Sequence, residues 1–262
     1  MEFCSLYSGS SGNCLYVGSE KTKILVDAGL SGKRIEAALS EKNINPNEIK
    51  GIVVTHEHSD HTKGLGVLSR RYNIPIFANT KTWRAMHSSL GKISDENIKV
   101  FGSYKAFEIG DIVVNPFEVP HDAAEPCGYS FIKDKKKVTI ATDIGYVTDE
   151  IKNNIKDSDI VLIESNHDVD MLKVGPYPYE LKRRVLSNVG HLSNENAGKA
   201  IIDVLSSKIK NILLGHLSDT NNYPFLAHET VISVLKMEGI SPGKDFTLDV
   251  ATREKPTKIY SV

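Results

Sequence analysis

A short run of histidines and acidic residues carries the strongest chemical signal in the chain. It is Thr55-His56-Glu57-His58-Ser59-Asp60-His61, and it directly follows the apolar run Gly51–Val54. Catalytic groups of open α/β sheets gather at the ends of strands, so this position favours a functional loop. His56 and His58 can turn both imidazoles toward one ion, and Asp60 and His61 can face a second. Neutral imidazole and carboxylate suit zinc, manganese or iron.

The alternative is that these are solvated polar loop residues, but further candidate ligands downstream argue against it. Three residues stand where an apolar run ends: His121 after Val113–Val119, Asp143 after Val138–Thr142, and His216 after Ile212–Gly215. Such runs are typical of strands that end in a loop, which repeats the setting of the histidine-rich run. His87 and His228 lie inside helical patterns and are interpreted as incidental.

Together these residues resemble the five ordered motifs of the metallo-β-lactamase superfamily, with Asp27 at the end of an early strand. The resemblance spans nearly the whole chain and implies a centre of two divalent metal ions. It implies that one ion takes His56, His58 and His121, and that the other takes Asp60, His61 and His216. Asp143 would bridge the ions, opposite a bridging hydroxide that acts as the nucleophile. Asp27 would orient the histidine-rich loop.

One departure narrows the branch of the superfamily. Typical zinc β-lactamases have a cysteine where this chain has Asp143. The resemblance therefore implies a thioesterase, lactonase or phosphodiesterase branch, and not an antibiotic-hydrolysing enzyme.

Longer segments resemble one group in particular, the YycJ/WalJ proteins. These are stand-alone bacterial proteins regarded as 5′→3′ exonucleases acting on DNA, for which a role in mismatch repair has been proposed. The resemblance implies a phosphodiesterase that uses two zinc or manganese ions (iron is also compatible) and takes DNA ends as substrate. The similar segments are Ser8–Cys14, Thr142–Val147, Glu164–Asp168, Gly175–Pro178 and Gly190–Glu195.

Candidate substrate contacts lie late in the chain. Gly190-His191-Leu192-Ser193 precedes a predicted helix at Asn194–Ser206. A helix N-terminus offers free N–H groups and a positive dipole end, which favour a phosphate. Ser193 and Asn194 are therefore candidate phosphate contacts, and His191 is a candidate catalytic residue beside Asp60 and Asp143. The alternative is that Ser193 or Asn194 is a plain N-cap and His191 a loop residue.

Two further features are compatible with a nuclease. The run Lys182-Arg183-Arg184 could contact a phosphate backbone, although a solvated helix face is the alternative. His167 is a candidate proton relay that supports the site without binding an ion. The rival function is a thioester or lactone hydrolase of the glyoxalase II kind on the same metals, and a third is a metal-stabilised scaffold without turnover. No capping insertion is apparent in the sequence, so an open groove is expected.

Alternating β-type runs and amphipathic stretches must position these residues. Two strand-rich zones, each flanked by helices, indicate two sheets packed face to face with helices outside. The expected fold is α/β, a four-layer αββα sandwich that forms one domain over residues 1–262. The predicted strands are Phe3–Tyr7, Cys14–Val17, Lys23–Val26, Gly51–Val54, Ile112–Phe117, Gly128–Lys133, Val138–Ala141, Ile160–Ile163, Ile212–Leu214 and Phe246–Val250, and the predicted helices are Gly32–Lys42, Lys63–Tyr72, Lys81–Leu90, Asn194–Ser206 and Phe225–Met237.

The composition excludes several classes of protein. The chain has 262 residues and a net charge of −1, so it lacks the basic footprint of a protein that coats nucleic acid. It begins without a secretory signal pattern, and no run approaches the ~18 apolar residues of a membrane span. Cys4, Cys14 and Cys127 form no CxxC pair, so a cytoplasmic protein is expected. The native metal, the choice between DNA and RNA, and the oligomeric state stay open.

Overall fold

The N-terminal half of the chain builds the first sheet. The computed structural model describes residues 1–243 and 246–262. The strands are β1 (Glu2–Tyr7), β2 (Cys14–Gly18), β3 (Lys23–Val26), β4 (Ile49–Val53), β5 (Ile76–Asn79), β6 (Ile98–Phe101) and β14 (Tyr260–Ser261). Their order in the sheet is β14-β1-β2-β3-β4-β5-β6. Strands β1 to β3 are antiparallel, whereas β3 to β6 run parallel.

A second sheet follows the same plan. Its strands are β7 (Phe107–Ile109), β8 (Ile112–Glu118), β9 (Cys127–Lys133), β10 (Lys136–Ala141), β11 (Ile160–Glu164), β12 (Asn211–Gly215) and β13 (Thr247–Val250). Their order is β13-β12-β11-β10-β9-β8-β7. Strands β7 to β10 are antiparallel, and β10 to β13 are parallel.

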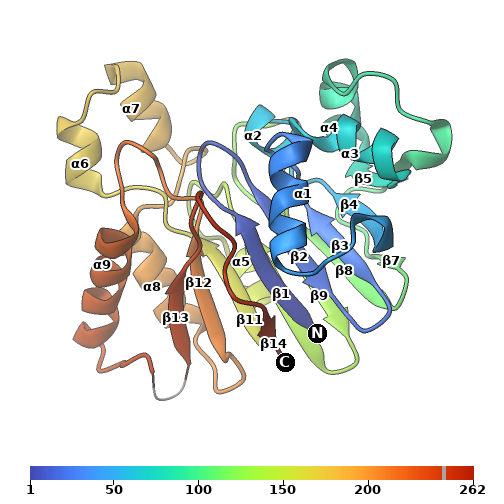
Figure 1. The fold of residues 1–262 in the computed structure, drawn as a ribbon. Coiled ribbons are helices and arrows are strands. Elements are labelled where there is room, and N and C mark those ends of the chain that lie inside the picture. The colour runs from blue at the N-terminus through green and yellow to red at the C-terminus, as the bar shows by residue number, and fades with distance from the viewer. Residues whose placement is uncertain (244–245) are drawn as a thin grey trace.

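Most of the helices cover the outer faces of the two sheets, whereas the short helices of residues 169–185 stand beyond the strand ends at the upper left (Figure 1). The first sheet carries α1 (Gly32–Glu41), α2 (Ser59–Thr62), α3 (Leu65–Tyr72) and α4 (Thr80–Met86), and the second half of the chain adds α5 (Asp149–Ile155), α6 (Val169–Val174), α7 (Tyr179–Val185), α8 (Asn194–Val204) and α9 (Pro224–Met237). Within the described ranges, no helix has the length and apolar character needed to cross a bilayer.

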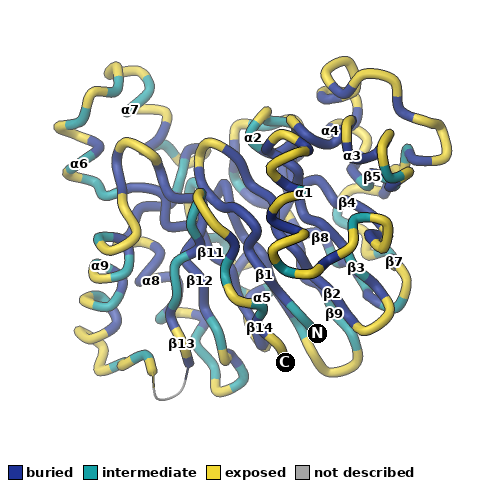
Figure 2. Tube along the Cα trace, viewed as in Figure 1, coloured by how far each residue is buried: buried dark blue, intermediate teal, exposed yellow. Residues whose placement is uncertain are grey.

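Three apolar clusters separate the layers. One joins the first sheet to α1, α3 and α4, and includes Ile35 and Leu68. A second lies between the two sheets, where Val26 meets Phe131. The third joins the second sheet to α5, α8 and α9. Figure 2 shows both sheets as largely buried and the outer turns of the helices as exposed. The predicted four-layer αββα sandwich is therefore confirmed.

Several short elements escaped the sequence prediction. Strands β5, β6, β7 and β14 and helices α5, α6 and α7 were not expected, because elements of two to seven residues carry little periodicity. The predicted helix Lys63–Tyr72 begins only at Leu65. Gly64 precedes it and packs so tightly that a Cβ there would lie 2.3 Å from the carbonyl oxygen of Leu30. The predicted helix Lys81–Leu90 ends at Met86 and continues as a 3-10 turn.

The ends of the parallel strands supply the polar residues singled out in the sequence. Asp27 follows β3, Asp143 lies shortly after β10, and His216 follows β12. All three have left-handed backbones, with φ of 59°, 57° and 56°. This conformation is uncommon outside glycine and persists where the surrounding structure enforces it, often at functional sites. The sharp turns point the three side chains back across the strand ends.

The cysteines give a first prediction. Cys4 and Cys14 are 0% exposed and Cys127 is 1% exposed. Burial raises the pKa of all three thiols, that of Cys127 to about 12. Because the thiolate is the reactive form, native protein at pH 8 should not react with a thiol reagent such as DTNB. Denatured protein should release the colour of three thiols, and rapid labelling of native protein would contradict this packing.

Candidate metal centre

Three histidines from both sheets converge at one end of the sandwich. His56 and His58 lie on the loop after β4, and His121 lies on the loop after β8. Nε2 of His56 is 3.0 Å from Nδ1 of His58, and Nε2 of His121 is 3.4 Å from that same atom. One ion placed among the three nitrogens would therefore be held by both sheets at once.

A second group adjoins the first. Helix α2 presents Asp60 and His61, and Nε2 of His61 lies 3.4 Å from Oδ2 of Asp60. Asp143 stands between the groups. Its Oδ2 is 3.3 Å from Nε2 of His61, and its Oδ1 is 3.2 Å from Nε2 of His216 and 3.7 Å from Nε2 of His121. The structure thus brings together all seven residues predicted as metal ligands.

The arrangement fits divalent metal ions. Zinc bonds of about 2.0–2.1 Å in a tetrahedron separate neighbouring ligand atoms by about 3.3 Å, and the separations here are 3.0 to 3.7 Å. In addition, Oδ2 of Asp143 is buried without a hydrogen-bond partner among the described residues. Buried carboxylate oxygens are nearly always paired, so this oxygen is suited to a cation.

Hydrogen bonds fix the ring orientation of four of these histidines. Nδ1 of His61 is 2.7 Å from Oδ2 of Asp27, and Thr55 Oγ1 is 3.0 Å from Nδ1 of His56 and donates to Asp27 at 2.8 Å. Asp27 thus bonds to the histidine-rich loop that the resemblance implied it would orient. In each ring Nε2 lies among the other candidate ligands, which is the usual arrangement around a bound metal.

The other two rings are anchored by groups that the sequence did not single out. Nδ1 of His121 is 3.2 Å from the carbonyl oxygen of Gly190, and Nδ1 of His216 is 3.2 Å from Oδ1 of Asn13. Ser8 Oγ accepts from the backbone N–H of His216 at 2.8 Å. The glycine- and serine-rich turn that contains Ser8 and Asn13 was the only sequence signal for these contacts.

The protonation states agree with metal binding. Burial lowers the pKa of His56, His58 and His216, which keeps these imidazoles neutral. Burial acts to raise the pKa of Asp143, but His216 and His61 outweigh it and hold that pKa well below its usual range. For His61, burial acts to lower the pKa, and the carboxylate of Asp143 outweighs it and raises it. A metal ion bound among these residues would take the place of the proton on His61.

His191 lies beside the centre but is held by another group. Its Nδ1 is 2.7 Å from Oε1 of Glu164 and 3.8 Å from Oδ1 of Asp143. Burial acts to lower the pKa of His191, but Glu164 outweighs it and raises it to about 9. Oε2 of Glu164 accepts from the N–H groups of Ile144 and Leu192 at 2.7 and 3.2 Å. Both oxygens of Glu164 thus have partners. The carboxylate holds Nδ1 of His191, so Nε2 of that ring points away from Glu164.

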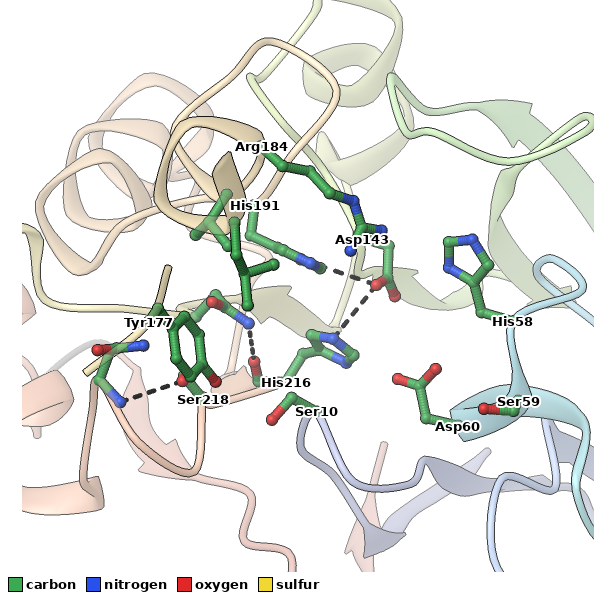
Figure 3. Close-up of a pocket in the computed structure, with 14 residues that line it drawn as sticks. Ser10, His58, Ser59, Asp60, Asp143, Tyr177, Arg184, His191, His216 and Ser218 are labelled. Carbon is green, nitrogen blue, oxygen red and sulfur yellow. Dashed lines mark hydrogen bonds and ion pairs between the residues drawn. The ribbon is translucent and has the colours of Figure 1, made fainter. Parts of the chain in front are cut away.

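An open pocket of about 340 Å³ lies over the centre. Figure 3 shows Asp143 joined to His216 and His191, with His58 and Asp60 on one side and Tyr177 and Ser218 on the other. Of the predicted catalytic and phosphate-binding residues, Asp60, Asp143, His191 and Arg184 line it. The full lining is Ser10, His58, Ser59, Asp60, Asp143, Asn166, Tyr177, Leu181, Arg184, Val185, His191, His216, Ser218 and Asn221.

Two predicted phosphate contacts have structural positions instead. Ser193 is the N-cap of α8, where its side chain accepts from the N–H of Asn196. Asn194 is 1% exposed, and its side chain bonds to Ser165 and Asn222. Neither residue lines the pocket. Their positions favour the capping role that was the alternative in the sequence, because the helix start is buried under its own polar network.

Of the three residues in the basic run Lys182-Arg183-Arg184, one lines the pocket and two do not. Arg184 lines the pocket and pairs with Asp122, through Nε and through Nη2 at 2.9 Å. Lys182 donates to the backbone of Lys173, and Arg183 pairs with Glu180 one turn earlier on α7. On a helix only one of three consecutive residues faces a given side, so one cation of the run reaches the pocket.

His167 does not support the site as predicted. It is buried, and neither ring nitrogen has a hydrogen-bond partner in the described part of the chain. Burial lowers its pKa to about 4, so the ring is neutral. It does not line the pocket, and it orients no metal ligand through a hydrogen bond.

One wall of the open pocket comes from an element that the sequence prediction lacked. Helices α6 and α7, joined by the segment 175–178, contribute Tyr177, Leu181, Arg184 and Val185 to one wall of the pocket. Two short helices with a Gly-Pro-Tyr-Pro connection give the pattern of a loop, and this hid the element in the sequence.

Comparison with known proteins identifies first the class and then the group. The model of the β-lactamase superfamily domain matches residues 22–217. Among solved structures, the metallo-β-lactamase fold protein YhfI from Bacillus subtilis superposes with a TM-score of 0.72 at 12% identity, covering 99% of this chain and 98% of that one. The short form of human tRNase Z superposes with a TM-score of 0.66 at 17% identity, covering 100% and 99%. These likenesses show the shared fold.

Two curated relatives match the chain from end to end. Exodeoxyribonuclease YycJ of Bacillus anthracis is 48% identical over 264 residues, which covers 100% of this chain and 99% of that protein. Exodeoxyribonuclease WalJ of Streptococcus pneumoniae is 46% identical over 263 residues, covering 100% and 98%. The chain belongs to the YycJ/WalJ family of the metallo-β-lactamase superfamily.

Proposed function

We propose that this protein is a metal-dependent exonuclease that hydrolyses phosphodiester bonds at DNA ends. The observation that carries the proposal is the convergence of seven metal-type donors at one site. Four of them, His58, Asp60, Asp143 and His216, line an open pocket that also holds Arg184 and His191. A carboxylate, Asp143, occupies the central position of these donors. The full-length relatives named exodeoxyribonucleases support the same reaction.

Two divalent ions, zinc or manganese, are the proposed cofactors, and iron is compatible with the same donors. His56, His58 and His121 would hold one ion, Asp60, His61 and His216 the other, and Asp143 both. Such ions supply an activated water and neutralise charge on a phosphate.

The protein's own side chains would position the phosphate. Arg184 presents a guanidinium at the wall of the pocket, held there by Asp122. His191, with Nδ1 held by Glu164, can donate from Nε2 to a phosphoryl oxygen or to the leaving oxygen. The 5′→3′ direction, the role in DNA repair and the cytoplasmic location rest on the resemblance to the YycJ/WalJ family and belong to the proposal.

The experiment is a substrate panel with added zinc or manganese. It includes end-labelled linear duplex DNA, a covalently closed circle, RNA, a thioester and a β-lactam. Linear DNA should shorten progressively from an end while the circle resists. Efficient thioester hydrolysis with no action on any nucleic acid would establish the glyoxalase II-like rival instead.

The divided basic run gives a second prediction. Arg184→Ala should lower kcat/KM on linear DNA by about 10- to 100-fold, the worth of a charge-assisted hydrogen bond to phosphate. The matched control is the double variant Lys182→Ala with Arg183→Ala, whose side chains lie outside the pocket lining. It should change the rate by less than about twofold at 0.15 M salt, where exposed charges are screened. Equal losses in both proteins would show that the whole run contacts DNA.

A further inference from the structure

A carboxamide in the pocket wall has no hydrogen-bond partner among residues 1–243 and 246–262. Asn221 lies between β12 and α9 and lines the pocket, yet it is only 1% exposed. Neither its Oδ1 nor its Nδ2 has a hydrogen-bond partner among the described residues. An unmet buried polar group costs about 1–3 kcal/mol, so this carboxamide is suited to a ligand that enters the pocket.

Hydrogen bonds hold the backbone around Asn221, and this fixes the position from which its side chain extends. Its N–H donates to Ser218 Oγ at 3.1 Å, and its carbonyl accepts from the N–H of Asp168 at 2.9 Å. The neighbouring Asn222 shows the contrast. Its Nδ2 donates to the carbonyl oxygens of Ser165 and Asn166, at 3.0 Å each. Of two adjacent asparagines, one completes the fold and the other is left facing the pocket.

The surroundings of Asn221 are aromatic and apolar. Tyr177 lies on the α6–α7 connection and lines the same pocket, and Leu181 and Val185 from α7 add apolar surface. Figure 3 places Tyr177 and Ser218 on the side of the pocket away from His58 and Asp60. The backbone of Gly175 packs against the amide, because a Cβ there would lie 2.6 Å from Oδ1 of Asn221. This wall of the pocket therefore contains both the flat ring of Tyr177 and the amide of Asn221.

The chemistry of the amide selects among the parts of a DNA end. A phosphate only accepts hydrogen bonds, so it would satisfy Nδ2 and leave Oδ1 unpaired. A nucleobase carries donors and acceptors side by side on its edges, and it can pair with both atoms of an asparagine. Its flat face also stacks on aromatic rings, which contributes about 1–3 kcal/mol per base. A pocket of about 340 Å³ is small among ligand pockets, as a site for one nucleotide requires.

We infer that Asn221 and Tyr177 form a subsite for the base of the terminal nucleotide, whose phosphate lies over the metal centre. The inference deepens the proposed exonuclease function and rests on it. Asn221 pairs with the base edge, and Tyr177 stacks on its face. Digestion therefore requires an unstacked terminal base, and the α6–α7 element determines which nucleotides are accepted.

The test combines two variants with substrates that lack the terminal base. Linear duplexes carry a normal terminus, or a tetrahydrofuran abasic residue at the 5′ or the 3′ terminus. For the wild type, the initial kcat/KM should be about 10- to 100-fold lower than on a normal terminus when the abasic residue is at the end that the enzyme digests. Asn221→Ala and Tyr177→Leu should each digest the normal end more slowly than the wild type does. On the abasic end, where the base is already missing, the variants should differ much less from the wild type. Tyr177 is partly exposed, so its variant tests the inference even if Asn221→Ala folds poorly.

Matched controls and a second substrate separate the alternatives. Tyr179→Leu and Asn153→Ala alter exposed residues outside the pocket lining and should behave as wild type. Hydrolysis of the small diester bis(p-nitrophenyl) phosphate by the wild type reports the metal centre without a nucleobase, and the subsite variants should keep the wild-type metal content. If each variant lost the same factor in kcat/KM on normal and abasic ends, the base subsite would be overturned. The same would follow if the loss depended on a terminal phosphate and not on the base. If the wild type hydrolyses the small diester but no DNA, the exonuclease proposal itself fails.

Discussion

Replacement of Asp143 by Ala should remove bound metal and lower nuclease activity by at least about 10³-fold, because several kcal/mol of charge stabilisation are lost. Both carboxylate oxygens of Asp143 lie among ligand nitrogens, at 3.2 Å from His216 and 3.3 Å from His61. Elemental analysis beside kinetics measures the two effects. A variant that keeps its metal and its activity would contradict the central position of Asp143.

Backbone strain must be separated from loss of the ligand in this experiment. Asp143 has a φ of 57°, and alanine in the left-handed region costs roughly 1–2 kcal/mol. Asp143→Asn tolerates that conformation and removes only the charge, so it should lose metal and activity while its melting temperature changes less. Asp95→Ala, at an exposed site, is the control for loss of a carboxylate and should keep both metal and activity.

His191→Ala should leave the metal content unchanged and lower turnover by about 10²- to 10⁴-fold, the usual worth of a proton donor or acceptor in the transition state. The ring is held by Glu164, whose oxygens are already occupied by Ile144 and Leu192. Glu164→Gln cannot accept at both positions, because its amide nitrogen is a donor, so it should disturb the His191 ring and also lower turnover. His228→Ala, on the surface of α9, should have no effect.

Metal analysis decides what the role of His191 is. Donor atoms of Asp143, Glu164, His191 and His216 lie within 4.8 Å of one another, so a metal ligand is the specific alternative. If metal content falls together with activity in His191→Ala, the residue binds or supports an ion and does not act on the phosphate.

The sequence pointed to a cluster of candidate metal ligands because metal ligation restricts residue types. His56, His58, Asp60 and His61 stand close together after a buried strand, and the remaining candidates each follow an apolar run. Parallel strands bring their carboxyl ends to one edge, so position along the chain translates directly into position in space. The four-layer fold was predicted from the two strand-rich zones, each flanked by helices.

Apart from Asp27, the groups that orient the ligands and His191 could not be predicted in this way. Asn13, Thr55 and Glu164 are common polar residues, and nothing in their spacing distinguishes them from loop or strand residues. Their roles arise from tertiary contacts, such as the 3.2 Å contact between Asn13 and His216, which are 203 residues apart. The left-handed turns at Asp27 and Asp143 likewise depend on the surrounding structure.

The pocket walls were the least predictable part. Short helices α6 and α7 flank a proline-rich connection, and Ser193 and Asn194 showed a helix start without showing which way it faces. That residues 1–262 act as one domain stays a prediction, as do the oligomeric state and the choice of metal.

Return of metal to stripped protein tests the central claim most directly. Protein freed of metal by a chelator is given zinc or manganese from zero to about four equivalents per chain, and nucleotide release from linear duplex DNA is followed. The account predicts no release without metal and a rate that saturates near two ions per chain. Undiminished digestion by metal-free protein, or a fully loaded protein that leaves linear DNA intact, would contradict it.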